Sequence, residues 1–210
     1  MNKGIIKTLY IIDSCSFIYE SIKSIMGNDG LNIRHLHYAD CESLTFYKSC
    51  LTDVEEIIIS VYRYNQLKII DTILSCRKKI KLIAIVNGER SQMIKILLSL
   101  GVHFIVSLRD PVFIFKQVLG NKNLECYITP RFKTIINNFE RNYLVDLQKS
   151  LAGGKSNLTK RERATIISLL CGLTTRKLAK KNHCSIKTVS AHKTNALKKL
   201  REKSINQFFL

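Results

Sequence analysis

The first 120 residues alternate short apolar runs with stretches in which apolar residues recur at helical spacing. Short apolar runs between polar residues predict buried strands, and a 3.6-residue period predicts amphipathic helices. Strands are expected at residues 5–12, 33–38, 56–61, 80–86 and 103–107. Helices are expected near residues 16–26, 42–50, 65–76, 90–100 and 112–119. Asp110 is expected to cap the last of these helices, with Pro111 at its first position. Five such strand–helix units predict an α/β fold, a doubly wound parallel (βα)5 sheet with right-handed crossovers.

A second pattern fills residues 158–200, where three short helices are expected in close succession. Thr159 followed by Glu162 has the spacing of a capping box, and Gly172 suits the end of that helix. Thr174 and Ser185 can cap the second and third helices in the same way. In the third helix the residues expected to pack inward are Ile186, Val189, Ala196, Leu197 and Leu200. Those expected to point outward are Lys187, Ser190, Ala191, Lys193, Thr194 and Lys198. Its outer face is therefore basic, short-chained and able to form hydrogen bonds.

Between these regions, residues 131–151 predict a linker helix with one apolar stripe. This stripe either packs on a core or forms a dimer seam. The AGGKSN run at 152–157 has the composition of a flexible break. We therefore expect an α/β domain at 1–125, a linker at 126–157 and a domain of three short helices at 158–210.

Charge follows the same division. The chain has 34 Lys and Arg against 16 Asp and Glu, a net charge of +18, of which residues 151–210 carry +12, with 14 bases against two acids. Such an excess favours polyanions, because binding them releases counterions. An α-helix fits the major groove of B-DNA, where polar side chains reach base edges and Lys reaches phosphates. We therefore expect double-stranded DNA as a partner.

Composition and motifs limit the expected cellular location and the expected chemistry of the chain. No apolar run approaches the ~20 residues of a membrane span, and no cleavable signal is evident, so a cytoplasmic protein without a membrane partner is expected. The seven cysteines are scattered without a CxxC pair and are expected to be reduced and mostly buried. There is no Gly-rich phosphate loop, HExxH or plausible nucleophile–base pair. We therefore expect no enzyme activity, cofactor or metal, and interpret His35 and His37 as surface residues on one face of a strand.

The motifs LTKRE, CGLTTRKLAKK, CSIKTVSAHKTN and KKL resemble those of the LuxR/NarL/FixJ class of bacterial transcription regulators. The resemblance covers most of the last quarter of the chain and implies that the third helix enters the major groove. It implies base contacts by Ser190, Ala191 and Thr194, and phosphate contacts by Lys187, His192, Lys193 and Lys198. Two features depart from the family pattern. Arg201 stands where Gly is usual, and the residues after it cover only a turn or two of the fourth helix that commonly dimerises these domains.

The order of a (βα)5 domain and a helix-turn-helix also resembles a response regulator, and YITPRF at 127–132 resembles the segment after a NarL-type receiver. A phosphorylatable receiver needs paired acids, an acceptor Asp, a Ser or Thr and a Lys, because Mg²⁺ and the phosphoryl group require these ligands. Here Asp13 is followed by Ser14. The remaining positions hold Ser60 or Val61, Asn87, and Leu108 or Arg109. We predict that aspartyl phosphorylation does not switch this domain, and that Asp13 caps the following helix.

Regulators of the RcsA, BglJ and EcpR type share such degenerate receivers and work constitutively or by pairing with another regulator. Two functions therefore stay open, a sequence-specific regulator that acts as a homodimer and an auxiliary protein active only as a heterodimer with a related regulator. The operator, the direction of regulation and any ligand stay open as well.

Overall fold

The computed structural model describes residues 8–26, 31–42, 54–76, 80–88, 91–121, 123–139 and 157–209. These residues form two compact units. The first comprises Met1–Tyr62, Thr72–Gly88 and Val102–Thr129, and the second Arg63–Asp71, Glu89–Gly101 and Pro130–Leu210. None of the described helices is long and apolar enough to cross a membrane.

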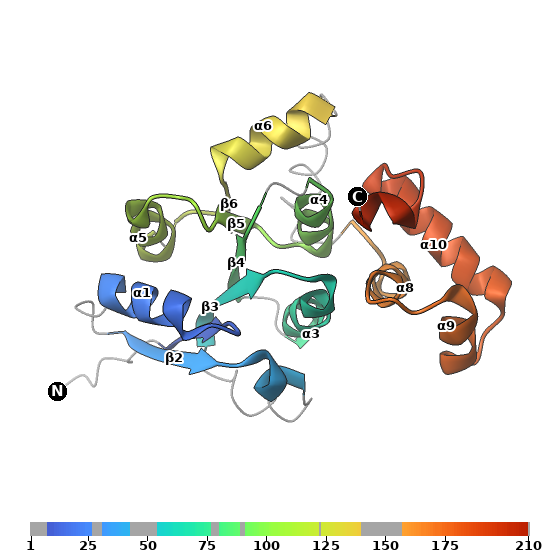
Figure 1. The fold of residues 1–210 in the computed structure, drawn as a ribbon, viewed down its shortest axis with the longest axis horizontal. Coiled ribbons are helices and arrows are strands. Elements are labelled where there is room, and N and C mark those ends of the chain that lie inside the picture. The colour runs from blue at the N-terminus through green and yellow to red at the C-terminus, as the bar shows by residue number, and fades with distance from the viewer. Residues whose placement is uncertain are drawn as a thin grey trace. The chain divides into compact units, whose positions relative to one another are not determined.

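A six-stranded parallel sheet in the order β2-β1-β3-β4-β5-β6 forms the first unit (Figure 1). Its strands are β1 (Thr8–Ile12), β2 (Asn32–Leu36), β3 (Val54–Val61), β4 (Lys81–Val86), β5 (Phe104–Ser107) and β6 (Tyr127–Ile128). The short helix η1 (Tyr38–Glu42) follows β2, while α1 (Ser16–Met26) and α5 (Val112–Gly120) lie beside each other on one face of the sheet. The predicted parallel α/β architecture is confirmed.

The central strands read as continuous apolar runs because both of their faces are buried. Ile57, Ile58 and Ile59 of β3 are each 0 % exposed. On the α1–α5 side, Ile58 belongs to a cluster that also contains Ile22 of α1 and Phe115 of α5. Burial of this apolar surface fixes the register of the sheet.

Three details differ from the expectations. First, β6 adds a sixth strand beside β5, in a segment that the sequence pattern left without a strand. Second, Pro111 is the N-cap residue of α5, so the helix begins one residue later than expected and Asp110 lies outside it. The Asp110 carboxylate accepts hydrogen bonds from Ser107 N (3.0 Å) and Thr129 Oγ1 (2.5 Å), which hold it at the ends of β5 and β6.

The cysteines are the third difference. All six within the described residues are free thiols, but only Cys41 is buried, whereas Cys15, Cys76, Cys126 and Cys184 are exposed and Cys171 is intermediate. The expectation of mostly buried cysteines is therefore wrong. The exposed ones lie outside the strands, at the end of α3 or in the connections before α1, β6 and α10, where the chain runs near solvent.

The second unit is mainly helical. It contains η2 (Tyr64–Gln66), the start of α3 (Leu67–Cys76), α4 (Ser91–Leu100), α6 (Pro130–Phe139), α8 (Lys160–Leu170), α9 (Thr175–Lys181), α10 (Ile186–Leu200) and η3 (Ile205–Phe209). Nine of the ten residues of α4 are buried, so this helix is covered around its circumference. A small apolar cluster joins α8, α9 and α10. It contains Leu169, Leu178, Ala179 and Val189, with Ile205 packed against it.

Some expectations fall outside the described residues. They are the helix at 42–50 beyond Glu42, the linker helix beyond Phe139, and the flexible break at 152–156. The linker helix is described only as α6, in which Phe132 is buried.

Candidate nucleic-acid interface

Each of the three C-terminal helices begins with a side-chain cap. Thr159 Oγ1 accepts from Glu162 N (3.3 Å) while Glu162 Oε2 accepts from Thr159 N (2.8 Å), which completes the predicted capping box. The Thr174 hydroxyl accepts from Lys177 N (3.2 Å), and the Ser185 hydroxyl accepts from Thr188 N (3.0 Å). These caps satisfy donors that the first turn of a helix leaves unpaired. All three predicted helix starts are confirmed.

The turns between these helices need left-handed backbone. Gly172, after α8, has φ 88°, as its position predicted, and His183, after α9, has φ 49°. After the second turn, Cys184 N donates to Ala179 O (3.1 Å) and so closes α9. The two turns allow α10 to cross α8 and α9 after short connections.

The inner face of α10 packs largely as predicted. Val189, Ala196, Leu197 and Leu200 are buried. Ile186 is 51 % exposed, so its predicted inward position is wrong. As the first residue of α10 it precedes the turns of the helix that are covered. The helical spacing of apolar residues does not reveal at which turn of α10 the neighbouring helices begin to cover it.

The outer face of α10 presents one continuous stripe. Lys187, Ala191, Thr194 and Lys198 are exposed. At about 100° per residue they fall within roughly 60° of one another around the helix axis. We call these four residues the reading stripe. Ser190, half-buried, lies at its edge.

Two of the residues for which phosphate contacts were expected lie elsewhere on α10. His192 and Lys193 are half-buried. The helical period turns them by about 140° and 120° from Lys187, in opposite directions. The structure therefore brings together four of the seven predicted DNA-contacting residues, with Ser190 beside them and this pair on the flanks.

Further basic side chains surround α10. Six lysines and arginines on or next to α8 and α9 are exposed, namely Lys160, Arg161, Arg176, Lys177, Lys180 and Lys181. The sequence analysis assigned none of these six residues a role. Their presence on the same small domain as the reading stripe concentrates positive charge on that domain.

A buried acid supports this domain from within. Glu162 is 5 % exposed, and its carboxylate accepts from Lys199 Nζ at 2.7 Å. Burial alone would raise the pKa of Glu162, but hydrogen bonds from Lys199 and Thr159 and the charge of Lys199 outweigh it and lower that pKa. Glu162 thus ties the start of α8 to the last turn of α10.

At the carboxyl end of the sheet, the candidate receiver chemistry is a closed network. Asp13 is 0 % exposed, and its Oδ2 accepts from Ser60 Oγ (2.7 Å) and Tyr62 Oη (3.3 Å). Its Oδ1 accepts from Cys15 N (3.1 Å) in the turn before α1, so the expected capping of α1 itself is not observed. Burial, followed by the charge of Asp13, raises the pKa of Tyr62, which keeps this phenol a donor. Asp13 is therefore held by groups of its own chain.

His35 lies in β2 and His37 directly after it, with ring centroids 4.7 Å apart. His37 is exposed, as expected of a surface residue, whereas His35 is half-buried. The ring of Tyr19 stacks on His35 at 5.0 Å, so an aromatic neighbour of α1 covers this histidine. Within the residues that the structure describes, no three His, Cys, Asp or Glu side chains gather as metal ligands would.

The capped helices, the left-handed turns and the exposed basic stripe define a helix-turn-helix domain. Residues 156–209 match the family model of bacterial regulatory proteins of the luxR family, about a quarter of the chain. The last quarter therefore has both the helix arrangement and the sequence pattern of a LuxR-type helix-turn-helix. This match is to regulatory proteins, in agreement with the expectation that the chain is not an enzyme.

The fold of the whole chain resembles that of the response regulator RcsB. A structure of an RcsB–DNA complex is 15 % identical with a TM-score of 0.55, covering 97 % of this chain and 96 % of that one. RcsB of Salmonella typhimurium is 17 % identical with a TM-score of 0.51, covering 97 % of both chains. A structure of two RcsB dimers bound to two parallel DNAs is 14 % identical with a TM-score of 0.53, covering 97 % and 96 %. Likeness at this identity concerns the fold. No curated protein matches the chain.

Proposed function

We propose that this chain is a transcription regulator that reads double-stranded DNA with α10. The observation that carries the proposal is the reading stripe, which stays exposed on a helix whose opposite face is buried. Ala191, Thr194 and the adjacent Ser190 are short enough to meet base edges, and Lys187 and Lys198 bracket them where phosphates would lie. His192 and Lys193 are proposed to meet phosphates from the flanks of the helix.

The test distinguishes residues that contact phosphates from residues that contact bases. Lys198→Ala should weaken binding to every duplex and make the dependence of affinity on salt shallower, by about one unit of slope for each phosphate that is no longer neutralised. Thr194→Ala should instead change which sequence is preferred. Lys133→Ala, an exposed lysine of α6, is the matched control and should change neither. Identical behaviour of the first two variants would contradict the assignment of α10.

We further propose that the sheet domain, residues 1–125, works without aspartyl phosphorylation. Ser60 supplies a hydroxyl where an acceptor carboxylate would be needed, and it donates to Asp13. One buried carboxylate that already accepts three hydrogen bonds is a poor ligand for Mg²⁺, which needs several open oxygen ligands.

Intact mass measurement tests this directly. The purified chain is incubated with acetyl phosphate and Mg²⁺ and then weighed, beside a sample without the phosphodonor. No acid-labile gain of one phosphoryl group is expected. A stable gain that disappears in Asp13→Asn would contradict the proposal.

For the sheet domain we propose a role in pairing, through the side formed by α1 and α5. Phe17 of α1 and Phe113 of α5 are 74 % and 63 % exposed, on helices that contact each other. Large exposed aromatic side chains on adjacent helices are typical of protein interfaces. The RcsB structure with dimers on DNA makes a second copy the first candidate partner, and a related regulator is the alternative.

Sedimentation and DNA binding distinguish these partners. A homodimer predicts a two-chain species that Phe17→Ser with Phe113→Ser converts to monomer, and selective binding of the promoter upstream of its own gene over a scrambled duplex. Weak, equal binding of both duplexes by a monomeric wild-type chain would instead support the alternative, a regulator that needs a related partner.

A further inference from the structure

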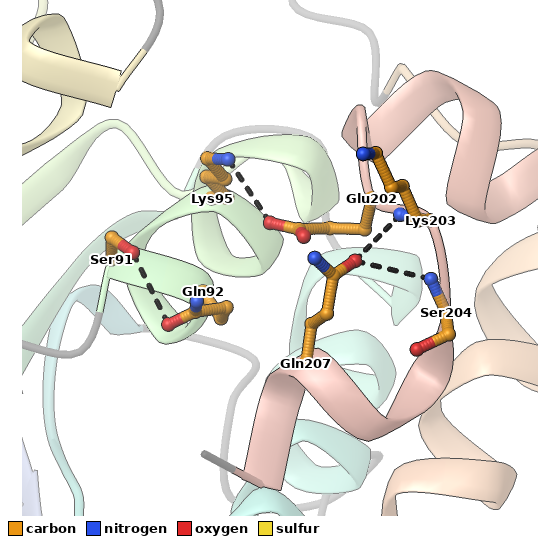
Figure 2. Close-up of polar contacts among 7 residues, drawn as sticks. All are labelled: Ser91, Gln92, Lys95, Glu202, Lys203, Ser204 and Gln207. Atoms are coloured by element: carbon orange, nitrogen blue, oxygen red, sulfur yellow. Dashed lines mark hydrogen bonds and ion pairs between the residues drawn. The ribbon is translucent and has the colours of Figure 1, made fainter.

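The segment that follows α10 contacts two elements that precede it by more than a hundred residues, namely η2 and α4. Lys95 Nζ of α4 lies 3.0 Å from Glu202 Oε1, and each side chain is 6 % exposed (Figure 2). The ring of Phe208, 3 % exposed, packs edge-on against that of Tyr64 in η2, with centroids 6.3 Å apart. The Tyr64 hydroxyl donates to Phe208 O. All of these residues belong to the second compact unit.

The segment is shaped for this contact by its own hydrogen bonds. Gln207 Oε1 accepts from Lys203 N (2.6 Å) and Ser204 N (3.1 Å), which ties the start of the segment to η3 (Figure 2). Arg201 takes a left-handed conformation, with φ 54°, and turns the chain out of α10. These bonds are made within residues 202–209 themselves, so they favour the docked conformation of the segment and lower the entropy cost of docking.

Charge makes the contact specific. Lysine and glutamate are almost never buried unless they are paired, because the desolvation of either charge alone is unfavourable. A buried lysine on α4, a helix covered around its circumference, therefore requires an acid beside it. Glu202 supplies one, and the aromatic contact with Tyr64 lies on the same short segment.

The reading stripe stays exposed while this contact is made. We propose that residues 202–209 are an internal clasp, which binds the surface formed by Tyr64 and Lys95 and holds the helix-turn-helix with its DNA-reading face open. The surface formed by Tyr64 and Lys95 is then covered by a segment of the same chain, so pairing between two chains uses another surface. The part that concerns DNA rests on the proposed function.

Fluorescence tests the clasp without DNA. The chain has no Trp, so Phe208→Trp introduces a single reporter, and Phe209→Trp, 58 % exposed and 5.7 Å from the Tyr64 ring, replaces it if folding fails. In the full chain a reporter at position 208 should be protected from acrylamide, and one at position 209 should be quenched less than after release of the segment, because its ring lies against that of Tyr64. Glu202→Gln should remove that protection, because breaking a buried ion pair favours release by about 100-fold. The milder Tyr64→Phe removes the hydrogen bond to Phe208 O and should reduce the protection. Lys116→Met, a control at an exposed lysine, should leave the protection unchanged.

Two results would overturn the clasp. The first is a reporter that is quenched equally with and without Glu202→Gln. The second is DNA binding that becomes tenfold tighter in Glu202→Gln, which would mean that the segment holds the reading face closed. The expected affinity for a single duplex site is unchanged within a factor of about two, because release uncovers nothing on α10. Protection that behaves as expected in a chain that binds no DNA would support the clasp and contradict the proposed function.

Discussion

The carboxyl edge of the sheet and the outer face of α10 both gather polar side chains, but they differ in how far these are already satisfied. At the sheet edge, Asp13 accepts from Ser60, Tyr62 and the backbone of Cys15 and is inaccessible. On α10 the reading stripe is exposed. A polar group recognises a partner only when its hydrogen-bonding capacity is not spent inside the fold. The comparison therefore supports the proposed recognition by α10 and a structural role for the sheet edge.

The largest expected effect concerns the core beneath the reading stripe. Leu178 of α9 is 2 % exposed in a cluster with few members. Leu178→Ala should lower the free energy of unfolding by about 2–5 kcal/mol, through reduced burial and an unfilled cavity, and should abolish DNA binding. Urea unfolding followed by circular dichroism measures the first effect, with Leu108→Ala, 39 % exposed, as the control. A loss below about 1 kcal/mol would show that this cluster does not support α10.

The sheet edge gives the second prediction. Ser60→Ala removes a hydroxyl that donates to a buried carboxylate, at 2.7 Å. Hydrogen bonds to charged groups contribute about 1.5–3 kcal/mol, so the free energy of unfolding should fall by that amount while DNA affinity stays unchanged. Ser24→Ala, at an exposed position of α1, should have no effect on stability. A loss of DNA affinity in a stable Ser60→Ala protein would mean that this edge signals to the reader, and the contrast drawn above would fail.

The helix-turn-helix could be predicted almost entirely from its sequence, because its signals are local. Thr159, Thr174 and Ser185 each cap a helix within three residues of their own position. Gly172 marks a turn by its own conformational freedom. Since such contacts depend on the nearest turn of chain, a single sequence contains the information needed to find them.

The remaining features depend on contacts between distant segments. The two residues of β6 form a strand by pairing with the edge of β5. Asp110 does not cap α5, and its carboxylate instead accepts a hydrogen bond from Thr129, nineteen residues later. The pairing of Lys95 with Glu202 spans more than a hundred residues. Periodicity and capping motifs do not predict these three features, because they depend on tertiary contacts.

In the helix-turn-helix, unlike at the sheet edge, a buried carboxylate with a lowered pKa makes stability depend on pH. The lowered pKa of Glu162 means that its contribution is fully present above the unfolded value of 4.5 and is lost as the pH falls through the lower folded value. Glu162→Gln should therefore cost about 1 kcal/mol at pH 7 and less in acid, measured by urea unfolding between pH 3 and 7. A cost that does not change with pH would contradict the roles of Lys199 and Thr159.

Asp71 is the control of opposite sign. Burial raises its pKa despite Arg163, whose Nε lies 3.2 Å from Asp71 Oδ1 without hydrogen-bond alignment. Its charged form is disfavoured in the folded chain, so its unfavourable contribution should appear as the pH rises above the unfolded value of 3.8 and be complete above the raised folded pKa. Asp71→Asn should remove that dependence.

The smallest effect is a gain in stability. Among the described residues, the two positive-φ positions without Gly, His183 and Arg201, both lie in the helix-turn-helix. A left-handed conformation costs an ordinary L-residue about 1–2 kcal/mol, and Gly offsets part of that gain through its freedom in the unfolded chain. His183→Gly should therefore raise the free energy of unfolding by about 0.5–1 kcal/mol. His183→Ala keeps the Cβ and should give no gain, so equal stabilisation by both variants would show that the imidazole, rather than the backbone, is strained. DNA affinity should be unchanged in both variants, because His183 lies in the turn before the reading stripe, and a change would extend the interface to that turn.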